Sequence, residues 1–219
     1  HFALEAGHVD EIVSVARVYE GDGVGLFAVP RRSVEVEPQE SLDASRELCR
    51  LRYHGVGVGP ERVLGTPGRS AAALERALDF ARVGLALEIA GSCRGLFELA
   101  LDYAKQRVQF DQPIGSFQAV QHKCADMFVA LQKARAVCLF ALMTLAEDDP
   151  RRRLAASMAK AAAGDCQALV CKEAIQIHGG TGFTWECDVH LFVKRAKTAA
   201  ALLGTAAEHR ARIADLLHV

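Results

Sequence analysis

Hydrophobic positions in this 219-residue chain follow two periods, short and alternating at the start and helical over the rest. Apolar runs at 12–16 and 24–29 predict two strands, and Asp22-Gly23 between them is a hairpin turn signal. Alternation at 34–36 and from 51 to about 58 predicts further strands, although three glycines weaken the last of them. Together these strands predict half of an antiparallel barrel or sandwich.

From Leu74 onward the apolar residues recur at the spacing of one helix face. Ser70 is the expected N-cap of the first helix, and three glycines at 84–95 within that helix indicate close approach of a neighbouring helix. We expect Gly179-Gly180 to end the third helix in left-handed geometry. The predicted helices cover about 71–101, 117–145, 154–177, 187–197 and 205–216. Long helices with short turns predict an up-and-down bundle.

The predicted fold class is therefore mainly α. Residues 1–66 are expected to form part of a β domain, and residues 67–219 an antiparallel helical bundle. Because the first four residues already read like mid-domain sequence, we expect a preceding region that this sequence does not contain.

The amino-acid composition and net charge exclude some classes of function. Hydrophobic residues make up 51% of the chain, which allows a sizeable core, and the net charge of −1 argues against a nucleic-acid partner. We find no signal peptide and no uncharged apolar run long enough to span a bilayer, so we expect no membrane association and a cytoplasmic location. The seven cysteines form no CxxC pair and occupy core-like positions, which predicts free thiols and no metal site.

Two helix-end segments carry the candidate chemistry, RVQFDQPIGSFQ at 107–118 and QIHGGTG at 176–182. The first offers a cation at Arg107, an aromatic ring at Phe110 and an amide at Gln118. The second ends a helix on two glycines. Guanidinium, amide and backbone N–H groups at helix ends suit a phosphate-bearing ligand.

The blocks YAKQRVQFDQPIGSFQAVQHKCADMF at 103–128 and IQIHGGTGFTWECDVHLFVKRAK at 175–197 resemble the C-terminal portion of the acyl-CoA dehydrogenase family. The resemblance extends over essentially the whole chain. It implies a bundle that holds FAD across a subunit interface, an acyl-CoA substrate, and an electron-transfer flavoprotein as redox partner. In that family a carboxylate removes the α-proton while the β-hydride passes to flavin N5.

The resemblance assigns FAD contacts to seven positions: Arg107, Phe110, Gln118, Gln176, Gly179, Gly180 and Thr205. Arg107 aligns with the arginine on the FAD pyrophosphate of the neighbouring subunit, and Phe110 with an aromatic ring near the adenosine part. Most of these positions also have an ordinary interpretation. Arg107 can be a solvated helix-end arginine and Phe110 a residue of the loop core, while the glutamines can cap helices and the glycines can simply end one.

Asp79 and Arg82 form an Asp-x-x-Arg pattern on the first long helix. In the family this pattern faces the acyl-CoA, with the arginine near the CoA phosphates or adenine. The competing interpretation is an exposed i, i+3 ion pair of little energy.

Both positions at which the family carries its catalytic base lack a carboxylate. Leu203 stands before Gly204-Thr205, where most members have glutamate, and Ala81 fills the position that a smaller branch uses. Glu88, two helical turns beyond Ala81, and Glu208 are weak substitutes. An ordinary surface or ion-pair role is the competing interpretation for both.

Two further departures concern the flavin. The aromatic and hydroxyl residues that flank the isoalloxazine in the family align with Phe2 and Leu4, and Leu4 cannot donate a hydrogen bond to N5. Ala207 stands where a second glutamine is expected after Gly-Thr.

The resemblance therefore implies the base-lacking subunit of a heterotetramer, similar to bacterial members that act on steroid side-chain CoA thioesters. In those enzymes one subunit type carries the base and the other completes the FAD site. Two alternatives stay open: a structural or binding paralogue without flavin, and a flavin monooxygenase or nitroalkane-oxidase-like relative. The family analogy also implies association with like or related subunits.

Overall fold

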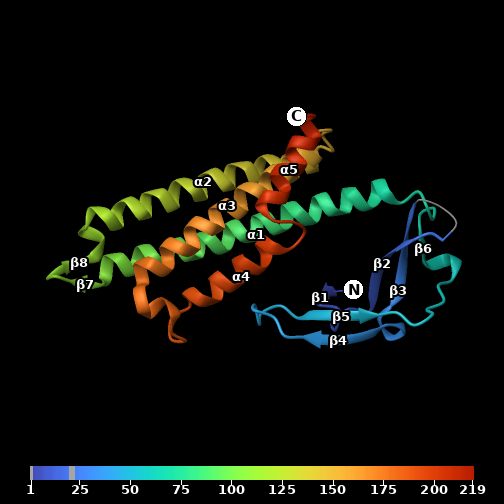
Figure 1. Cartoon of the computed structure of the whole chain (residues 1–219), viewed down its shortest axis with the longest axis horizontal. Coiled ribbons are helices and arrows are strands. Elements are labelled where there is room, and N and C mark those ends of the chain that lie inside the picture. The colour runs from blue at the N-terminus through green and yellow to red at the C-terminus, as the bar shows by residue number, and fades with distance from the viewer. Residues whose placement is uncertain (1, 20–22) are drawn as a thin grey trace. The chain divides into compact units, whose positions relative to one another are not determined.

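The structure, a computed structural model, describes residues 2–19 and 23–219 (Figure 1). Contacts divide the chain into two compact units, one up to Ala77 and the other from Leu78 to Val219. Helices account for most of the chain, which confirms the predicted fold class.

The first unit holds two three-stranded antiparallel sheets. One runs in the order β1-β5-β4, formed by Phe2–Leu4, Leu48–Arg52 and Glu35–Gln39. The other runs in the order β2-β3-β6, formed by Glu11–Arg17, Val24–Pro30 and Val63–Leu64. Strands β2 and β3 pair as predicted for a hairpin, while Asp22 of the predicted turn lies outside the described residues.

Strand β5 differs from its prediction. Its residues Cys49 and Leu51 are buried in the small core of this unit, but the strand ends at Arg52 instead of reaching Val58. Gly55 has a φ of 62°, and a left-handed backbone cannot continue a strand. The extended region from 53 to 58 was therefore a wrong prediction.

The second unit is built from five helices, at the places where the apolar period predicts them. They are α1 (Ala71–Gln106), α2 (Gln118–Ala146), α3 (Arg152–His178), α4 (Val189–Ala201) and α5 (Ala206–Leu217). Helix α3 packs against α2, α4 and α5. One buried cluster takes Leu96 from α1, Met127 from α2 and Val170 from α3, so the sides of these helices that the periodicity marks as apolar form the core.

The glycines of α1 were predicted to mark close packing against a neighbouring helix, and they differ in outcome. A Cβ on Gly95 would lie 2.6 Å from the ring of Phe192, so this glycine makes room on α1 for a side chain of α4. The same expectation is wrong at Gly84 and Gly91, where an added Cβ would meet open space. The left-handed end of α3 is also wrong in part: Gly179 has φ 61° and ψ −140°, and a 3-10 turn over Gly179–Phe183 follows.

Helix α2 is the segment to weigh against the expectation that no uncharged apolar run could span a bilayer. It is interrupted by charged residues, including Lys133 and Arg135. Among the described residues it alone is long and apolar enough by length and composition, with a mean hydropathy of 1.6 over its most apolar 18 residues. A core helix of a bundle passes the same test, and α2 packs along α3. Its outward-facing apolar side chains are Phe128, Val129, Leu139, Phe140, Leu142 and Met143.

Candidate functional site

The segment that follows α1 forms a tight hairpin. Strands β7 (Val108–Gln109) and β8 (Gln112–Pro113) pair with a two-residue loop of Phe110 and Asp111, whose φ values are 54° and 63°. Left-handed φ at both loop residues matches the twist of a two-residue hairpin, but it is uncommon for a phenylalanine. The ring of Phe110 is 86% exposed and meets the edge of Phe117 at 6.1 Å between centroids. The loop thus presents an aromatic ring to solvent.

Arg107 is held by its backbone and leaves its side chain outside. Its N–H donates to the carbonyl of Tyr103 at 2.8 Å, and its own carbonyl accepts from the N–H of Ile114 at 2.8 Å. The guanidinium is exposed and makes no ion pair with any residue that the structure describes. Gln118, the first residue of α2, is also exposed. Both groups are open to a ligand.

The second segment exposes an amide and two backbone positions. Gln176 lies on the solvent side of the last turn of α3. Gly179 and Gly180 are exposed, and an ideal Cβ on either would have no heavy atom within 4 Å. An anion can therefore approach their main chain without steric hindrance.

The structure brings the two segments to the same end of the bundle (Figure 1). The ring of Tyr103, near the end of α1, stacks on the ring of His178, the last residue of α3, with centroids 4.5 Å apart and planes 25° apart. Beside this stack, a pocket of about 550 Å³ lies between the end of α1, the hairpin region and the start of α2. It is lined by Leu101, Ala104, Lys105, Pro113, Gly115, Ser116, Val120, Gln121 and Cys124.

Asp79 and Arg82 are buried, which excludes the interpretation as an exposed ion pair. Their side chains are 1% and 8% exposed, and a guanidinium nitrogen of Arg82 lies 2.9 Å from the Asp79 carboxylate. Arg152 on α3 and Arg212 on α5 each come within 3.9 Å of the same carboxylate. Asp79 therefore ties three helices together from inside the bundle.

Leu203 lies at the corner between α4 and α5 and is the residue at the family's usual base position. It has a φ of 54°, Gly204 follows with a φ of 102°, and the leucine side chain is 40% exposed. Ala81, at the other base position, is exposed on α1. Neither side chain can accept a proton.

The corner is fastened by side chains from both sides. Nζ of Lys160, a residue of α3 that is 1% exposed, donates to the carbonyls of Ala200 and Gly204 at 2.9 and 2.8 Å. Burial lowers the pKa of Lys160 to about 8, and Glu208 opposes part of that shift. On the other side, Nε2 of His209 donates to the carbonyl of Leu203 at 3.0 Å, since a carbonyl can only accept. Burial, together with the charges of nearby cations, lowers the pKa of His209.

Glu208 belongs to the helix start and is a poor candidate for the base. Its carboxylate accepts from the N–H and the hydroxyl of Thr205 at 2.7 and 2.9 Å, while its own N–H donates to the Thr205 hydroxyl at 3.3 Å. This reciprocal pattern is a capping box. The backbone hydrogen bond from Thr205 lowers the pKa of Glu208, so the carboxylate becomes a weaker base.

Glu88 is also engaged. Its carboxylate lies 2.9 Å from Nε of Arg195 on α4, and both side chains are about one-third exposed. This pairing matches the competing interpretation of an ordinary ion pair. Phe2 and Leu4 lie in the first unit, where Phe2 is 64% exposed and Leu4 pairs with Leu48 in the sheet.

Sequence reasoning missed Lys160, His209, Tyr103 and His178. A signal existed for Lys160, because it is the only charge in the apolar stretch from 154 to 164. Tyr103 and His178 lie inside the two blocks of resemblance, next to the residues that were selected.

Comparison with known proteins agrees with this geometry. The model of the "Acyl-CoA dehydrogenase, C-terminal domain" family matches residues 70–218. Acyl-CoA dehydrogenase IpdE2 of Mycobacterium tuberculosis is 36% identical over 167 residues, which are 76% of this chain and 47% of that protein. The chain thus spans about half the length of this relative.

Two solved structures show the same arrangement. Butyryl-CoA dehydrogenase from Megasphaera elsdenii superposes with a TM-score of 0.92 at 26% identity, over 99% of this chain and 58% of that one. A structure described as "Tcur3481-Tcur3483 steroid ACAD G363A variant" superposes with a TM-score of 0.85 at 30% identity, over 96% of this chain and 55% of that one. Because the family model matches two-thirds of the length of this chain, the chain is a member of the acyl-CoA dehydrogenase family.

Proposed function

We propose that this chain is the base-lacking subunit of an FAD-dependent acyl-CoA dehydrogenase, and that a related subunit supplies the catalytic carboxylate. One observation carries the proposal. Leu203 and Ala81 leave both base positions without an acceptor, whereas the two cofactor segments keep exposed polar groups at one end of the bundle. Because these groups are exposed and have no partner among the described residues, they are available to a ligand.

FAD is the cofactor that the family relationship supports, and the exposed groups fit its ADP half. The Arg107 guanidinium can pair with a phosphate through two N–H groups, and the open backbone at Gly179-Gly180 can receive the other phosphate. The exposed ring of Phe110 offers a stacking face to the adenine. The pocket of about 550 Å³ beside the hairpin is large enough for the adenosine. Gln118 and Gln176 supply amides at the rim.

The chain's own residues then bind and orient, and move no proton. FAD, when bound, accepts the hydride from the β-carbon of the thioester. Removal of the α-proton needs an acceptor on the opposite side of the Cα–Cβ bond. Glu88 is paired with Arg195, and Glu208 is held in its capping box, so neither is free to supply that acceptor. Within the residues of this chain, neither carboxylate is placed to serve as the acceptor, and we propose that a related subunit supplies it.

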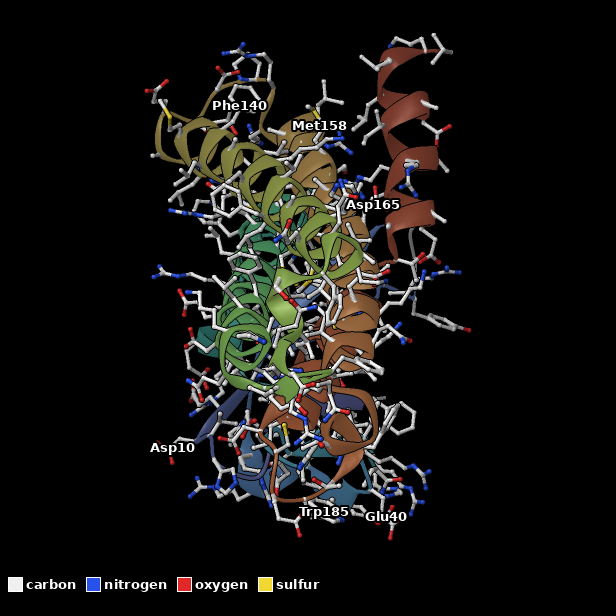
Figure 2. The ribbon with its side chains drawn as sticks, turned by 90° about the vertical axis from the view of Figure 1, so that its left-hand side faces the viewer. Asp10, Glu40, Phe140, Met158, Asp165 and Trp185 are labelled. Atoms are coloured by element: carbon white, nitrogen blue, oxygen red, sulfur yellow. The ribbon has the colours of Figure 1, made fainter. Side chains whose placement is uncertain are left out.

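Asp79 and Arg82 are proposed to serve the acyl-CoA from within the bundle. Because the pair is buried, with Arg82 held 2.9 Å from the Asp79 carboxylate, its proposed role is to fix the part of α1 that faces the acyl-CoA. The outward apolar face of α2, which includes Phe128, Val129 and Met143, is the proposed contact with a like or related subunit. Figure 2 labels Phe140 on this helix. An electron-transfer flavoprotein as electron acceptor and a cytoplasmic location complete the proposal.

The test uses the full-length protein, alone and co-expressed with a relative that has glutamate at the position of Leu203. Flavin absorbance measures bound FAD, and acyl-CoA-dependent dye reduction measures turnover. We expect background turnover alone and clear turnover with the partner. Turnover of the protein alone that Glu88→Gln abolishes and Glu98→Gln preserves would refute the proposal. Glu98 is a matched control, since it is an α1 carboxylate paired with Arg94 at 2.8 Å.

The same measurements separate the alternatives. A full-length protein without flavin absorbance in either preparation would indicate a structural paralogue. Reduction of its flavin by an NADH-dependent reductase, and not by acyl-CoA, would indicate a monooxygenase-like relative.

A further inference from the structure

The stacked rings of Tyr103 and His178 link the two cofactor segments. Tyr103 is one helical turn before Arg107, and its carbonyl accepts the hydrogen bond from the Arg107 N–H at 2.8 Å. His178 immediately precedes Gly179. Among the described residues, no hydrogen bond or ion pair joins 107–118 directly to 176–182. The ring stack is thus a direct side-chain contact between the helix ends that carry the two segments.

The His178 ring is fixed in place on its own helix. It is 6% exposed, and its Nδ1 donates to the carbonyl of Ala174 at 2.8 Å. Gly182 closes the turn beneath it, where an added Cβ would lie 3.0 Å from the Cβ of His178. The hydrogen bond to Ala174 thus fixes the orientation of the ring, and the turn that carries Gly179-Gly180 packs against the Cβ of His178.

Tyr103 lies near the end of α1, against which the hairpin region packs. A Cβ on Gly115 would lie 2.9 Å from the carbonyl oxygen of Ala104, so the hairpin region rests directly on the last turn of α1. The carbonyl of Arg107 is also held by Ile114. The helix turn that carries Tyr103 is therefore also the turn that supports Arg107 and the hairpin.

We infer that Tyr103 and His178 are positioning residues that set the spacing between the Arg107 guanidinium and the Gly179-Gly180 backbone, so that both reach one diphosphate. The inference depends on the proposed function, because FAD supplies that diphosphate. Two groups that must contact two phosphates at once lose binding when their separation changes by about 1 Å. Neither ring needs to touch the ligand for this role.

The experiment measures FAD and ADP affinity of the full-length protein, with its partner subunit where the complex is needed, after removal of bound flavin. Tyr103→Leu removes the stack and Tyr103→Phe keeps it. Phe97→Leu is the matched control, because Phe97 on the same helix pairs with Phe128 at 5.8 Å, away from both segments. We expect Tyr103→Leu to weaken FAD and ADP binding at least tenfold, Tyr103→Phe to stay within twofold of wild type, and riboflavin binding to be unchanged. Phe97→Leu should lower Tm without changing FAD affinity.

Equal loss of FAD affinity in Tyr103→Leu and Phe97→Leu, in proportion to their Tm, would overturn the positioning role. So would an equal loss for riboflavin, which has no phosphate. If Tyr103→Leu does not fold, His178→Leu removes the stack from the other helix and must give the same pattern. A wild-type protein that binds neither FAD nor ADP would overturn the proposed function itself, and this result is distinct from the other two.

Discussion

Two corners of the same bundle treat their polar groups in opposite ways. At the end where α1 and α3 finish, the Arg107 guanidinium and the Gln118 and Gln176 amides face solvent, and the described residues leave them without a partner. At the corner between α4 and α5, the carbonyls of Leu203 and Gly204 are held by His209 and Lys160. Under the proposed function, the first corner serves a ligand, whereas the second stabilises the chain itself.

If the proposed function is correct, this difference explains how a chain without the base can keep a cofactor surface. A leucine at 203 leaves the hydrogen bonds of the corner intact, because they use backbone carbonyls and the Thr205–Glu208 box, not the side chain at 203. Exposed cations and amides at the other corner add little to stability, so a ligand remains the best reason to keep them. The predictions below test this division, beginning with the largest effect.

Arg107→Gln should weaken FAD binding about 100-fold, roughly 2.7 kcal/mol, because a charged paired contact to phosphate is lost. The Tm of the protein without flavin should not change, since the guanidinium has no partner among the described residues. Flavin fluorescence titration and thermal melts measure the two quantities. Arg94→Gln is the control, as Arg94 is also exposed on α1 but pairs with Glu98. A fall in Tm with unchanged FAD affinity would reverse the assignment of this corner.

Much of this contrast could be predicted from sequence. The apolar period located all five helices, because each buries one side in a common core. The helix ends at Arg107 and Gly179 could also be identified, since turn residues and glycines interrupt the period there. The strand prediction failed beyond Arg52, where a left-handed Gly55 overrides the apolar alternation.

The fastening of the second corner was not predictable in the same way. Whether Lys160 points inward depends on the carbonyls of Ala200 and Gly204, which are distant in sequence. The burial of Asp79 likewise depends on arginines from two other helices. The local sequence pattern predicts which side of a helix is buried, but not which distant residue contacts that side in the folded chain. The ring stack of Tyr103 and His178 escaped prediction for this reason.

Lys160→Met should destabilise the protein by about 2 kcal/mol, because two partly buried carbonyls lose their donor. FAD affinity should stay within about twofold of wild type if this corner is purely structural. Chemical denaturation gives the free energy of unfolding. Lys133→Met, an exposed lysine on α2, is the control and should change it by less than about 0.5 kcal/mol. A loss of FAD affinity without a loss of stability would mean that the corner also serves the ligand.

Lys160 also predicts a pH dependence of stability. Its pKa is about 8 in the folded protein and about 10.5 in the unfolded chain, so the unfolded chain binds more protons between these two pH values. The free energy of unfolding should therefore rise, through this group, as pH increases from about 8 to 10.5. Allowing for solvent screening, the gain is about 1.5 kcal/mol. The check is the difference between wild type and Lys160→Met measured at pH 7.5 and at about 10; a difference that does not change with pH contradicts the burial of a charged lysine.

Thr205→Ala should have the smallest effect. It tests whether Thr205 serves FAD binding or only caps α5. Family resemblance assigns this residue to FAD, yet its N–H and hydroxyl are both engaged with Glu208 in the capping box. Loss of the cap should lower the free energy of unfolding by about 1 kcal/mol, whereas Thr205→Ser should retain it. If the hydroxyl serves only the helix, FAD affinity will be the same in all three proteins. A selective loss of FAD affinity in Thr205→Ala, with stability unchanged, would show that Thr205 contacts the ligand. Lys160 and His209 would then be the residues that stabilise the corner.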